Sequence, residues 1–256
     1  MSDNRLQQRT VAHYDEFPFD FLTAEDEANI EQLQPPPFRR FADRHLSAGS
    51  VVAEIGCGPG RASLFLARRG IALTAIDISW GSLLLARRRA PACTFVRASN
   101  LALPLVDASF PFVVSDGVIH HTPDPYQSFT ELARILRPGG LLYLGVYRRK
   151  RYYYYVYTYI GAPVRWLEQR GWGKALIYAT LLPLYYGVHL VKSRGKRTWQ
   201  GAKNFFYDYI ITPQATFHTR EEIETWGARH GLALLDYDEH VGNVHAFVFR
   251  KQGGTA

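Results

Sequence analysis

A glycine-rich turn and the acidic residue that follows it are the strongest chemical signal in this sequence. The apolar residues Val51 to Ile55 run into the turn Gly56-Cys57-Gly58-Pro59-Gly60. Glycines in such a turn let backbone amides approach a ligand closely and adopt torsion angles that a Cβ forbids. Asp77 stands 21 residues after Gly56, at the end of the next apolar run, where a carboxylate accepts hydrogen bonds from ribose hydroxyls. The pattern predicts a binding site for a nucleoside-containing cofactor.

The spacing of the glycines narrows the kind of cofactor. A dinucleotide site requires the pattern G-x-G-x-x-G, and Arg61 stands where its last glycine belongs. The spacing therefore disfavours a nicotinamide cofactor. A glycine turn between a strand and a helix can also be purely structural, but Glu54 before the turn and Asp77 after it favour a binding site.

Four polar residues farther along the chain are candidates for catalysis. His120 and His121 follow the fourth predicted strand, at the edge where open parallel sheets bind ligands. Histidine suits the removal of a proton from an oxygen or nitrogen nucleophile at neutral pH. Asp208 and His218 form a second candidate group, which rests on the family resemblance described below. Structural alternatives stay open, because the paired imidazoles can bind backbone carbonyls and His218 can pack in the loop before Thr219.

The elements that position these residues follow from the hydrophobic pattern. Short apolar runs alternate with helical patterns between Val51 and Tyr147, which predicts strand–helix units and a parallel sheet. The expected strands are 51–55, 72–76, 94–96, 112–115 and 141–147, and the expected helices are 62–69, 83–89 and 127–136. Ser79 and Asp124 precede two of the helices as caps. Residues 137–140 are expected to end the third helix and turn the chain into the fifth strand.

The two ends of the chain extend this core. Residues 1–45 are aromatic and acidic, with prolines at 35–37 as a stiff break, and predict an N-terminal helical cap. Near the other end, Thr219 to Glu222 spells a capping box before a helix that ends at Gly231, and apolar stretches around Gly242-Asn243 predict an antiparallel hairpin. We therefore expect an α/β domain over residues 46–256, with a doubly wound, mostly parallel sheet of seven strands.

Five sequence blocks in a fixed order carry a resemblance to a known family. They are Glu54 to Gly60, Ala75 to Ser79, Leu103-Pro104, Ser115 to Pro125 and Leu136 to Leu142. Together they resemble the class I S-adenosylmethionine-dependent methyltransferases, which have a Rossmann-like fold. The resemblance is good over residues 51–147 and looser towards the C-terminus. It implies an enzyme that uses S-adenosyl-L-methionine and needs no metal. The order of Asp208, Pro213 and His218-Thr219 is also similar to a pattern in some bacterial members of this family, which makes Asp208 and His218 candidates for catalysis.

The resemblance also assigns residues to the cofactor. It places the glycine turn on the methionine part, Asp77 on the ribose and Ile78 on the adenine. Ser99 stands where relatives often have an aspartate facing the adenine amino group, which implies a weaker hold there, although serine can still accept a hydrogen bond. The expected cofactor-binding residues are Glu54, Gly56, Cys57, Gly58, Gly60, Asp77, Ile78, Ser99, Asn100, Leu101 and Ser115. Cys57 is expected to be a small packing residue, not a nucleophile.

Charge and aromatic content single out one segment of an otherwise ordinary composition. Of the 256 residues, 47% are hydrophobic and 21% charged, which argues against a disordered chain. Residues 148–197 hold 11 Lys and Arg against one acid, Glu168, whereas the rest of the chain has 19 basic and 22 acidic residues. The segment also contains four consecutive tyrosines, Tyr152 to Tyr155. By resemblance, residues 148–205 are an aromatic, basic lid insertion that shapes substrate choice.

Three hypotheses explain this segment. A lid over a hydrophobic or aromatic small molecule fits the apolar run Ala175 to Val191, which at 17 residues with a proline is too short to predict a membrane span. Peripheral contact with an anionic membrane surface through 148–197 is compatible with it. An RNA platform would also combine basic and aromatic residues. We expect the first, with a natural product, quinone or lipid-like acceptor methylated on oxygen, nitrogen or carbon; an RNA methyltransferase and a non-catalytic cofactor-binding protein are the alternatives.

The cysteine content and the N-terminal residues indicate the cellular compartment in which we expect the protein. Cys57 and Cys93 are the only cysteines, which argues against a disulfide-rich secreted scaffold and a cysteine-based zinc cluster. The first residues carry charges and show no apolar run of the length that a secretory signal has. We expect a cytoplasmic protein, with membrane contact at most peripheral.

Overall fold

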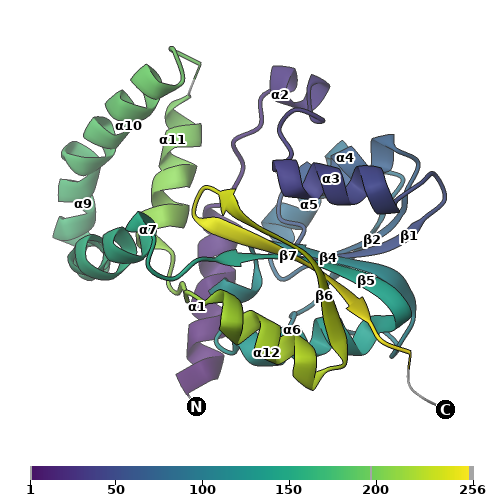
Figure 1. Ribbon diagram of the computed structural model, residues 1–256. Coiled ribbons are helices and arrows are strands. Elements are labelled where there is room, and N and C mark those ends of the chain that lie inside the picture. The colour runs from purple at the N-terminus through teal and green to yellow at the C-terminus, as the bar shows by residue number, and fades with distance from the viewer. Residues whose placement is uncertain (1, 197, 254–256) are drawn as a thin grey trace.

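Seven strands form one mixed sheet in the order β3-β2-β1-β4-β5-β7-β6 (Figure 1). The computed structural model describes residues 2–196 and 198–253. The strands are β1 (Val51–Ile55), β2 (Ala72–Asp77), β3 (Thr94–Arg97), β4 (Phe110–Asp116), β5 (Leu136–Tyr147), β6 (Leu232–Val241) and β7 (Val244–Lys251). Strands β1 to β5 are parallel, and β7 lies antiparallel between β5 and β6. The sheet is Rossmann-like, and the expected fold class is confirmed.

Helices cover both faces of this sheet. They are α3 (Pro36–His45), α4 (Arg61–Arg68) and α5 (Trp80–Arg89) on one face, and α6 (Pro125–Ile135) and α12 (Arg220–Arg229) on the other. Phe38 and Phe65 are fully buried in the first layer, and Phe129 and Ile223 in the second. Burial of these apolar side chains on both faces is the main force that holds the layers together.

Local capping signals in the sequence set the starts of three of these helices. The side chain of Ser79 accepts a hydrogen bond from the Ser82 amide, and the side chain of Asp124 accepts one from the Gln127 amide. Thr219 forms the expected capping box with Glu222 at the start of α12. These contacts satisfy amides that the first helical turn leaves without partners, and the predicted caps are confirmed.

Two local expectations differ from the structure. The prolines at 35–37 do not break the N-terminal region, because α3 begins at Pro36, where a missing amide hydrogen costs a helix nothing. Residues 137–140 do not separate α6 from β5, because the strand begins directly at Leu136. The register against β4 shifts between Phe110 and Phe112, and Gly139 supplies the left-handed torsion of φ +75° that this irregularity needs.

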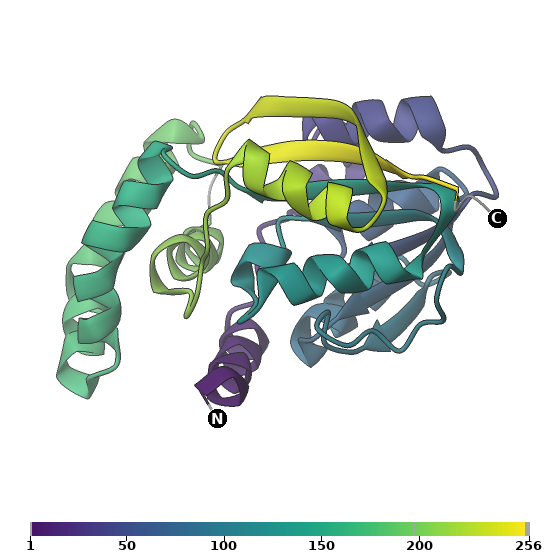
Figure 2. The same cartoon turned by 60° about the horizontal axis from the view of Figure 1, so that its bottom comes forward.

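The remaining helices lie outside the sheet. Two belong to the N-terminus, α1 (Ser2–Glu16) and α2 (Ala24–Ala28). The others follow β5 in one insertion: α7 (Tyr152–Tyr155), the π-helical segment η2 (Val156–Ile160), α8 (Gly161–Glu168), α9 (Gly171–Ala179), α10 (Leu181–Lys192), α11 (Trp199–Phe206) and the π-helical segment η3 (Tyr207–Ile211). The chain leaves the sheet at Arg148 and returns at His218, and these two residues form an isolated parallel bridge beside the sheet. Figure 2 shows α11 between the sheet and the outer helices of the insertion.

One helical stretch of the described chain has the length and apolar composition of a membrane-crossing helix. It is Gly171–Lys192, of 22 residues, with a mean hydropathy of 1.2 in its most apolar window. Only 11% of that window is buried inside the protein. This exposure distinguishes α9 and α10 from the core helices of the sheet.

Candidate active site

A cavity of about 440 Å³ opens at the carboxyl ends of the parallel strands. Residues from the ends of β1, β2 and β4 line one half of it, which is where open α/β sheets bind ligands. Residues from α1, from the segment 19–22 and from α11 and η3 line the other half. The site is therefore assembled from the sheet, the N-terminus and the insertion together.

The glycine turn gives the first half of the cavity a bare backbone wall. Gly58 has φ +52°, and no atom lies within 4 Å of where its Cβ would stand, so a ligand can approach its main chain. Gly56 has φ +78°, and a Cβ there would lie 2.3 Å from the Val118 side chain. Both glycines line the cavity, as does Cys57, whose thiol pKa is raised by burial. Cys57 is thus a neutral thiol beside the turn.

Asp77 faces the same wall from the end of β2. Its carboxylate accepts hydrogen bonds from the Gly58 amide at 2.8 Å and from the Ser79 amide at 2.9 Å. Desolvation raises the pKa of Asp77, and these amide hydrogen bonds oppose that effect. The glycine turn and the β2 carboxylate, which are separated in sequence, therefore form one polar corner of the cavity.

Carboxyl groups are the most frequent ionisable side chains of the cavity. Among the described residues that line it, the acidic ones are Asp20, Glu54, Asp77, Asp116 and Asp208, and Arg61 is the single Lys or Arg. Asp116 is paired with Arg61 at 2.9 Å, and Asp20 with Arg89. Burial raises the pKa of Glu54 to about 8, so this group is largely neutral at pH 7, and the Ser63 hydroxyl donates to it at 2.6 Å. Within the described part of the chain, Asp77 is therefore the carboxylate of the glycine-turn half that has no arginine partner and can attract a positively charged ligand.

Aromatic side chains make the second half of the cavity. Phe19, Phe21 and Leu22 come from the segment between α1 and α2, while Phe205 and Tyr209 come from α11 and η3. The rings of Phe19, Phe21 and Phe205 lie 5.0–5.1 Å apart by their centroids. Such a surface binds apolar or aromatic groups by excluding water.

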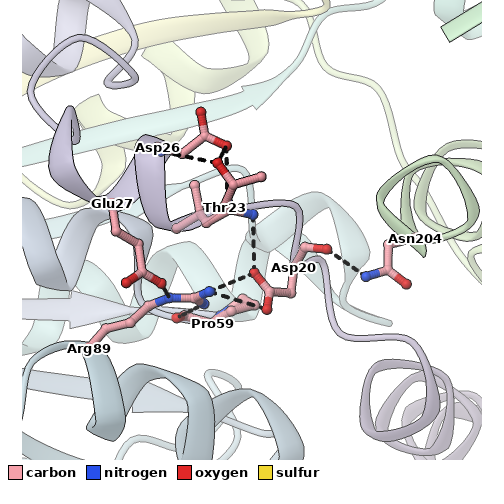
Figure 3. Close-up of polar contacts among 8 residues, drawn as sticks. Asp20, Thr23, Asp26, Glu27, Pro59, Arg89 and Asn204 are labelled. Atoms are coloured by element: carbon pink, nitrogen blue, oxygen red, sulfur yellow. Dashed lines mark hydrogen bonds and ion pairs between the residues drawn. The ribbon is translucent and has the colours of Figure 1, made fainter. Parts of the chain in front are cut away.

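An arginine at the end of α5 connects the two halves (Figure 3). Arg89 donates to the Pro59 carbonyl of the glycine turn at 2.8 Å and to the carboxylates of Asp20 and Glu27. The Asp20 carbonyl in turn accepts a hydrogen bond of 2.5 Å from Asn204 on α11. The segment that crosses the cavity is thereby fixed to the sheet on one side and to the insertion on the other.

Asp208 is a buried carboxyl group in the aromatic half. The Tyr14 hydroxyl on α1 donates to its Oδ1 at 3.2 Å, and this is a contact between residues 194 positions apart. Burial raises the pKa of Asp208 to about 7, although the hydrogen bond from Tyr14 favours the charged form. A carboxyl group with this pKa gains and loses a proton near neutral pH, as a general base must. Tyr14 carries no sequence signal for this role, because only tertiary packing brings α1 to η3.

The two adjacent histidines point to different surroundings. His121 lines the cavity, and its Nδ1 lies 2.8 Å from the Gln214 carbonyl, so Nδ1 carries the hydrogen and Nε2 is an acceptor. Burial lowers the pKa of His121 to about 4. His120 is fully buried outside the cavity lining, stacked on Tyr147 at 3.7 Å, and its Nδ1 accepts the Tyr147 amide hydrogen. The structure thus brings one of the pair to the site.

The other predicted site residues divide in the same way. The cavity lining includes Glu54, Gly56, Cys57, Gly58, Asp77, Ile78, Asn100, Leu101, His121 and Asp208, and it does not include Gly60, Ser99, Ser115, His120 or His218. Gly60 instead packs on α5, where a Cβ would lie 2.7 Å from the Ala86 backbone. Ser99 accepts a hydrogen bond of 2.7 Å from Gln7 on α1. His218 is buried between Thr216 and Glu222.

Comparison with known proteins identifies the sheet and its glycine turn. The profile of the methyltransferase domain family matches residues 53–144, which contain the turn, Asp77 and the strand end before His121. Residues 53–144 therefore form a methyltransferase domain, of the class I kind that the sequence resembles. The resemblance noted in the sequence is confirmed, and the cofactor of this domain is S-adenosylmethionine.

Similar proteins extend the match only part of the way along the chain. An uncharacterized methyltransferase of Mycobacterium avium is 36% identical over 125 residues, covering 48% of this chain and 47% of the relative. A malonyl-[acyl-carrier protein] O-methyltransferase of Enterobacter lignolyticus is 38% identical over 106 residues, covering 41% and 39%. The chain therefore spans less than half the length of these relatives.

Solved structures share the fold over nearly the whole chain. A 1,6-didemethyltoxoflavin-N1-methyltransferase of Burkholderia thailandensis, solved with 1,6-didemethyltoxoflavin and S-adenosylhomocysteine, covers 99% of this chain and 92% of its own. The TM-score is 0.58 and the identity 15%. At this identity the likeness establishes the fold.

The residues of the methyltransferase domain fit S-adenosylmethionine. The cofactor carries a sulfonium and an ammonium group, and carboxyl groups, with Asp77 among them, line the cavity. The open backbone at Gly58 allows close approach, and Asp77 offers a carboxylate beside it. The fit to the cofactor therefore rests on the chemistry of Gly58 and Asp77 in this chain, and it does not depend on the comparison with relatives.

Proposed function

We propose that the protein transfers a methyl group from S-adenosylmethionine to a small hydrophobic or aromatic acceptor, at an oxygen or nitrogen atom. The observation that carries this proposal is the shared cavity, in which the cofactor corner at Asp77 and an aromatic half with Asp208 adjoin. S-adenosylmethionine supplies an electrophilic methyl group when bound. The chain must therefore align the acceptor atom, take up its proton and keep water out.

Asp208 is the base in this proposal. Its pKa of about 7 leaves a substantial fraction of carboxylate at neutral pH, which can accept the proton that a hydroxyl or amine releases during methylation. His121 is a much weaker base, because burial holds its pKa at about 4. We assign His121 to orientation of the acceptor through its Nε2, and we assign no acceptor contact to His120 or His218.

Residues 148–205 act as the lid of the active site in this proposal, and residues 1–45 as its N-terminal cap. Support comes from Phe205 in the insertion and Phe19 in the N-terminal segment, which face the cavity together. The Asp20–Asn204 hydrogen bond joins these two regions across the aromatic half. An acceptor enclosed between them loses its contact with water.

The test uses methyl-labelled S-adenosylmethionine and an extract of the native cells. Label is expected in the fraction of apolar small molecules, and Asp208→Asn is expected to lower that transfer by about 10²–10⁴-fold while cofactor binding is retained. Asp107→Asn removes an exposed carboxylate on the β3–β4 connection and serves as the matched control. Label confined to RNA or protein, or full transfer by the Asp208→Asn variant, would contradict the proposal.

A further inference from the structure

We propose that the outer face of α9 and α10 docks the protein on an anionic lipid surface. The outer face consists of Trp172, Leu176, Leu184, Val188 and Val191, whose side chains are 45–80% exposed. Docking here is independent of the methyltransferase reaction, because none of these five residues lines the cavity.

The apolar exposure is concentrated on this part of the molecule. Of the seventeen large hydrophobic side chains exposed among the described residues, twelve lie between Tyr152 and Trp199. Within each helix the residues of the outer face stand three or four positions apart, which places Trp172 and Leu176 on one side of α9, and Leu184, Val188 and Val191 on one side of α10. The opposite side is buried: Ile177 and Leu182 are fully covered in a cluster with Phe17 and Phe206. One face of α9 and α10 thus packs on the protein while the other is left apolar and open.

The position of the helices allows this face to meet a flat surface. In Figures 1 and 2, α9 and α10 are the outermost elements on their side of the molecule, and α11 separates them from the sheet. Tyr185 and His189 of α10 lie against Phe206 and Phe205 of α11. A lipid surface under the outer face therefore lies one helix layer away from the aromatic half of the cavity.

Basic residues flank the apolar face. Arg170 precedes it and stacks on the exposed Trp166 ring at 3.4 Å, while the exposed Lys192, Arg194 and Lys196 follow it. Lys196 lies near Glu25, and Lys174 within the helix lies near Glu16 and Glu168, so part of the charge is already balanced. Lysines and arginines beside an apolar face are attracted to anionic lipid headgroups.

Exposed aromatic residues of the insertion add a second feature of interfacial segments. Trp166 on α8 and Trp172 on α9 are 54% and 62% exposed, and Tyr152, Tyr155 and Tyr159 on α7 and η2 are 51–67% exposed. Trp and Tyr side chains prefer the boundary between hydrocarbon and headgroups, since they combine an apolar ring with a polar group.

The geometry favours lying on the membrane over crossing it. A spanning helix is surrounded by lipid or by other spanning helices, whereas Ile177 and Leu182 are buried against the protein itself. The hydrogen-bonded helix is also interrupted at Thr180, which ends α9 and precedes α10. Only the outer face is free to enter the interface.

The test is sedimentation of the purified full chain with vesicles, without any acceptor. We expect binding to vesicles of phosphatidylglycerol and phosphatidylcholine, weaker binding to phosphatidylcholine alone, and release as salt shortens the Debye length from about 10 Å at 0.1 M to 3 Å at 1 M. Leu184→Glu with Val191→Glu is expected to lower the vesicle partition coefficient by about tenfold or more. The matched control is Val106→Glu with Leu235→Glu, at exposed apolar positions elsewhere.

A second variant, which changes charge and not apolar area, tests the proposal if the double glutamate variant fails to fold. Lys192→Gln with Arg194→Gln is expected to reduce binding to the anionic vesicles only, whereas Arg87→Gln with Arg88→Gln on α5 leaves it unchanged. Equal binding by test and control variants overturns the proposal, as does resistance to 1 M salt together with alkaline carbonate, which indicates a spanning helix. Binding of bulk RNA instead of vesicles, or a dimer that Leu184→Glu with Val191→Glu dissociates in the absence of vesicle binding, also overturns it.

Discussion

The half of the cavity around Gly58 and Asp77, where we propose that the cofactor binds (the cofactor half), is built from residues close together in the sequence. The aromatic half, where we propose that the acceptor binds (the acceptor half), is built from distant ones. Gly58 and Asp77 meet through a backbone amide at the ends of two adjacent strands. In the acceptor half, Tyr14 meets Asp208 across 194 positions and Asp20 meets Asn204 across 184. The cofactor half depends on backbone geometry that any folded sheet of this kind supplies. The acceptor half depends on side chains that tertiary packing must bring together. Four substitutions test whether the two halves of the cavity can be changed separately.

The largest effect is expected at Arg89, which joins the two halves. Its side chain is 9% exposed and pairs with Asp20 and Glu27, so Arg89→Ala leaves two carboxylates without their cation. We expect a loss of about 2–4 kcal/mol in the free energy of unfolding. Urea denaturation measures it, with Arg44→Ala as control: Arg44 is 61% exposed and pairs with Asp236 at 3.5 Å, and its loss should cost less than about 1 kcal/mol. Equal losses in the two variants would show that Arg89 does not join the halves.

Asp77→Ala tests the cofactor half alone. The variant removes a carboxylate that lies beside the open backbone of Gly58, and we expect S-adenosylmethionine affinity to fall by about 10–100-fold. Calorimetric titration gives the affinity, and unchanged tryptophan fluorescence should show that the insertion, which holds Trp166, Trp172 and Trp199, remains folded. Normal affinity in this variant would remove Asp77 from the cofactor site.

Tyr14→Phe tests the acceptor half through its pH dependence. The Tyr14 hydroxyl stabilises the charged form of Asp208, so its removal raises the pKa of Asp208 above about 7. A base acts when deprotonated, and the rise of kcat/KM with pH should therefore move upward, by about 0.5–1 pH unit. The cofactor affinity should not change. If the pH profile of kcat/KM does not shift, or shifts to lower pH, Asp208 is excluded as the titrating base.

The smallest effect is expected at Ser99, beside the cofactor half. Ser99→Asp introduces a carboxylate at the position that the family resemblance assigns to the adenine amino group, and Gln7 already donates to Ser99 from α1. We expect cofactor affinity to rise by about threefold, measured by the same titration. Unchanged or weaker binding would mean that this position does not hold the adenine.

The sequence predicted the cofactor half because its signals are local. Strand periodicity, the glycines of the turn and the interval to Asp77 each follow from a few neighbouring residues. It did not predict Tyr14, Phe19 or Arg89, because their place depends on how α1 and the insertion pack on the finished sheet. His120 and His121 illustrate the limit, since adjacent residues in one 3-10 turn (Ile119–His121) lie respectively in the core and in the cavity. The position of a residue in the sequence shows that it lies at the edge of the sheet, but it does not show whether its side chain points into the core or into the cavity.

The two π-helical segments of the insertion have a consequence for how acceptor choice can change. A π turn contains one residue more than an α turn, and Arg165 donates to the Tyr157 and Ile210 carbonyls, one in each segment. Deleting Tyr207 would shift the following residues by one position and so rotate Asp208 by about 100° relative to α11. Asp208 would then turn away from the cavity while every sheet residue kept its position. Relatives that differ by one residue in this segment are therefore expected to methylate different acceptors with the same cofactor site.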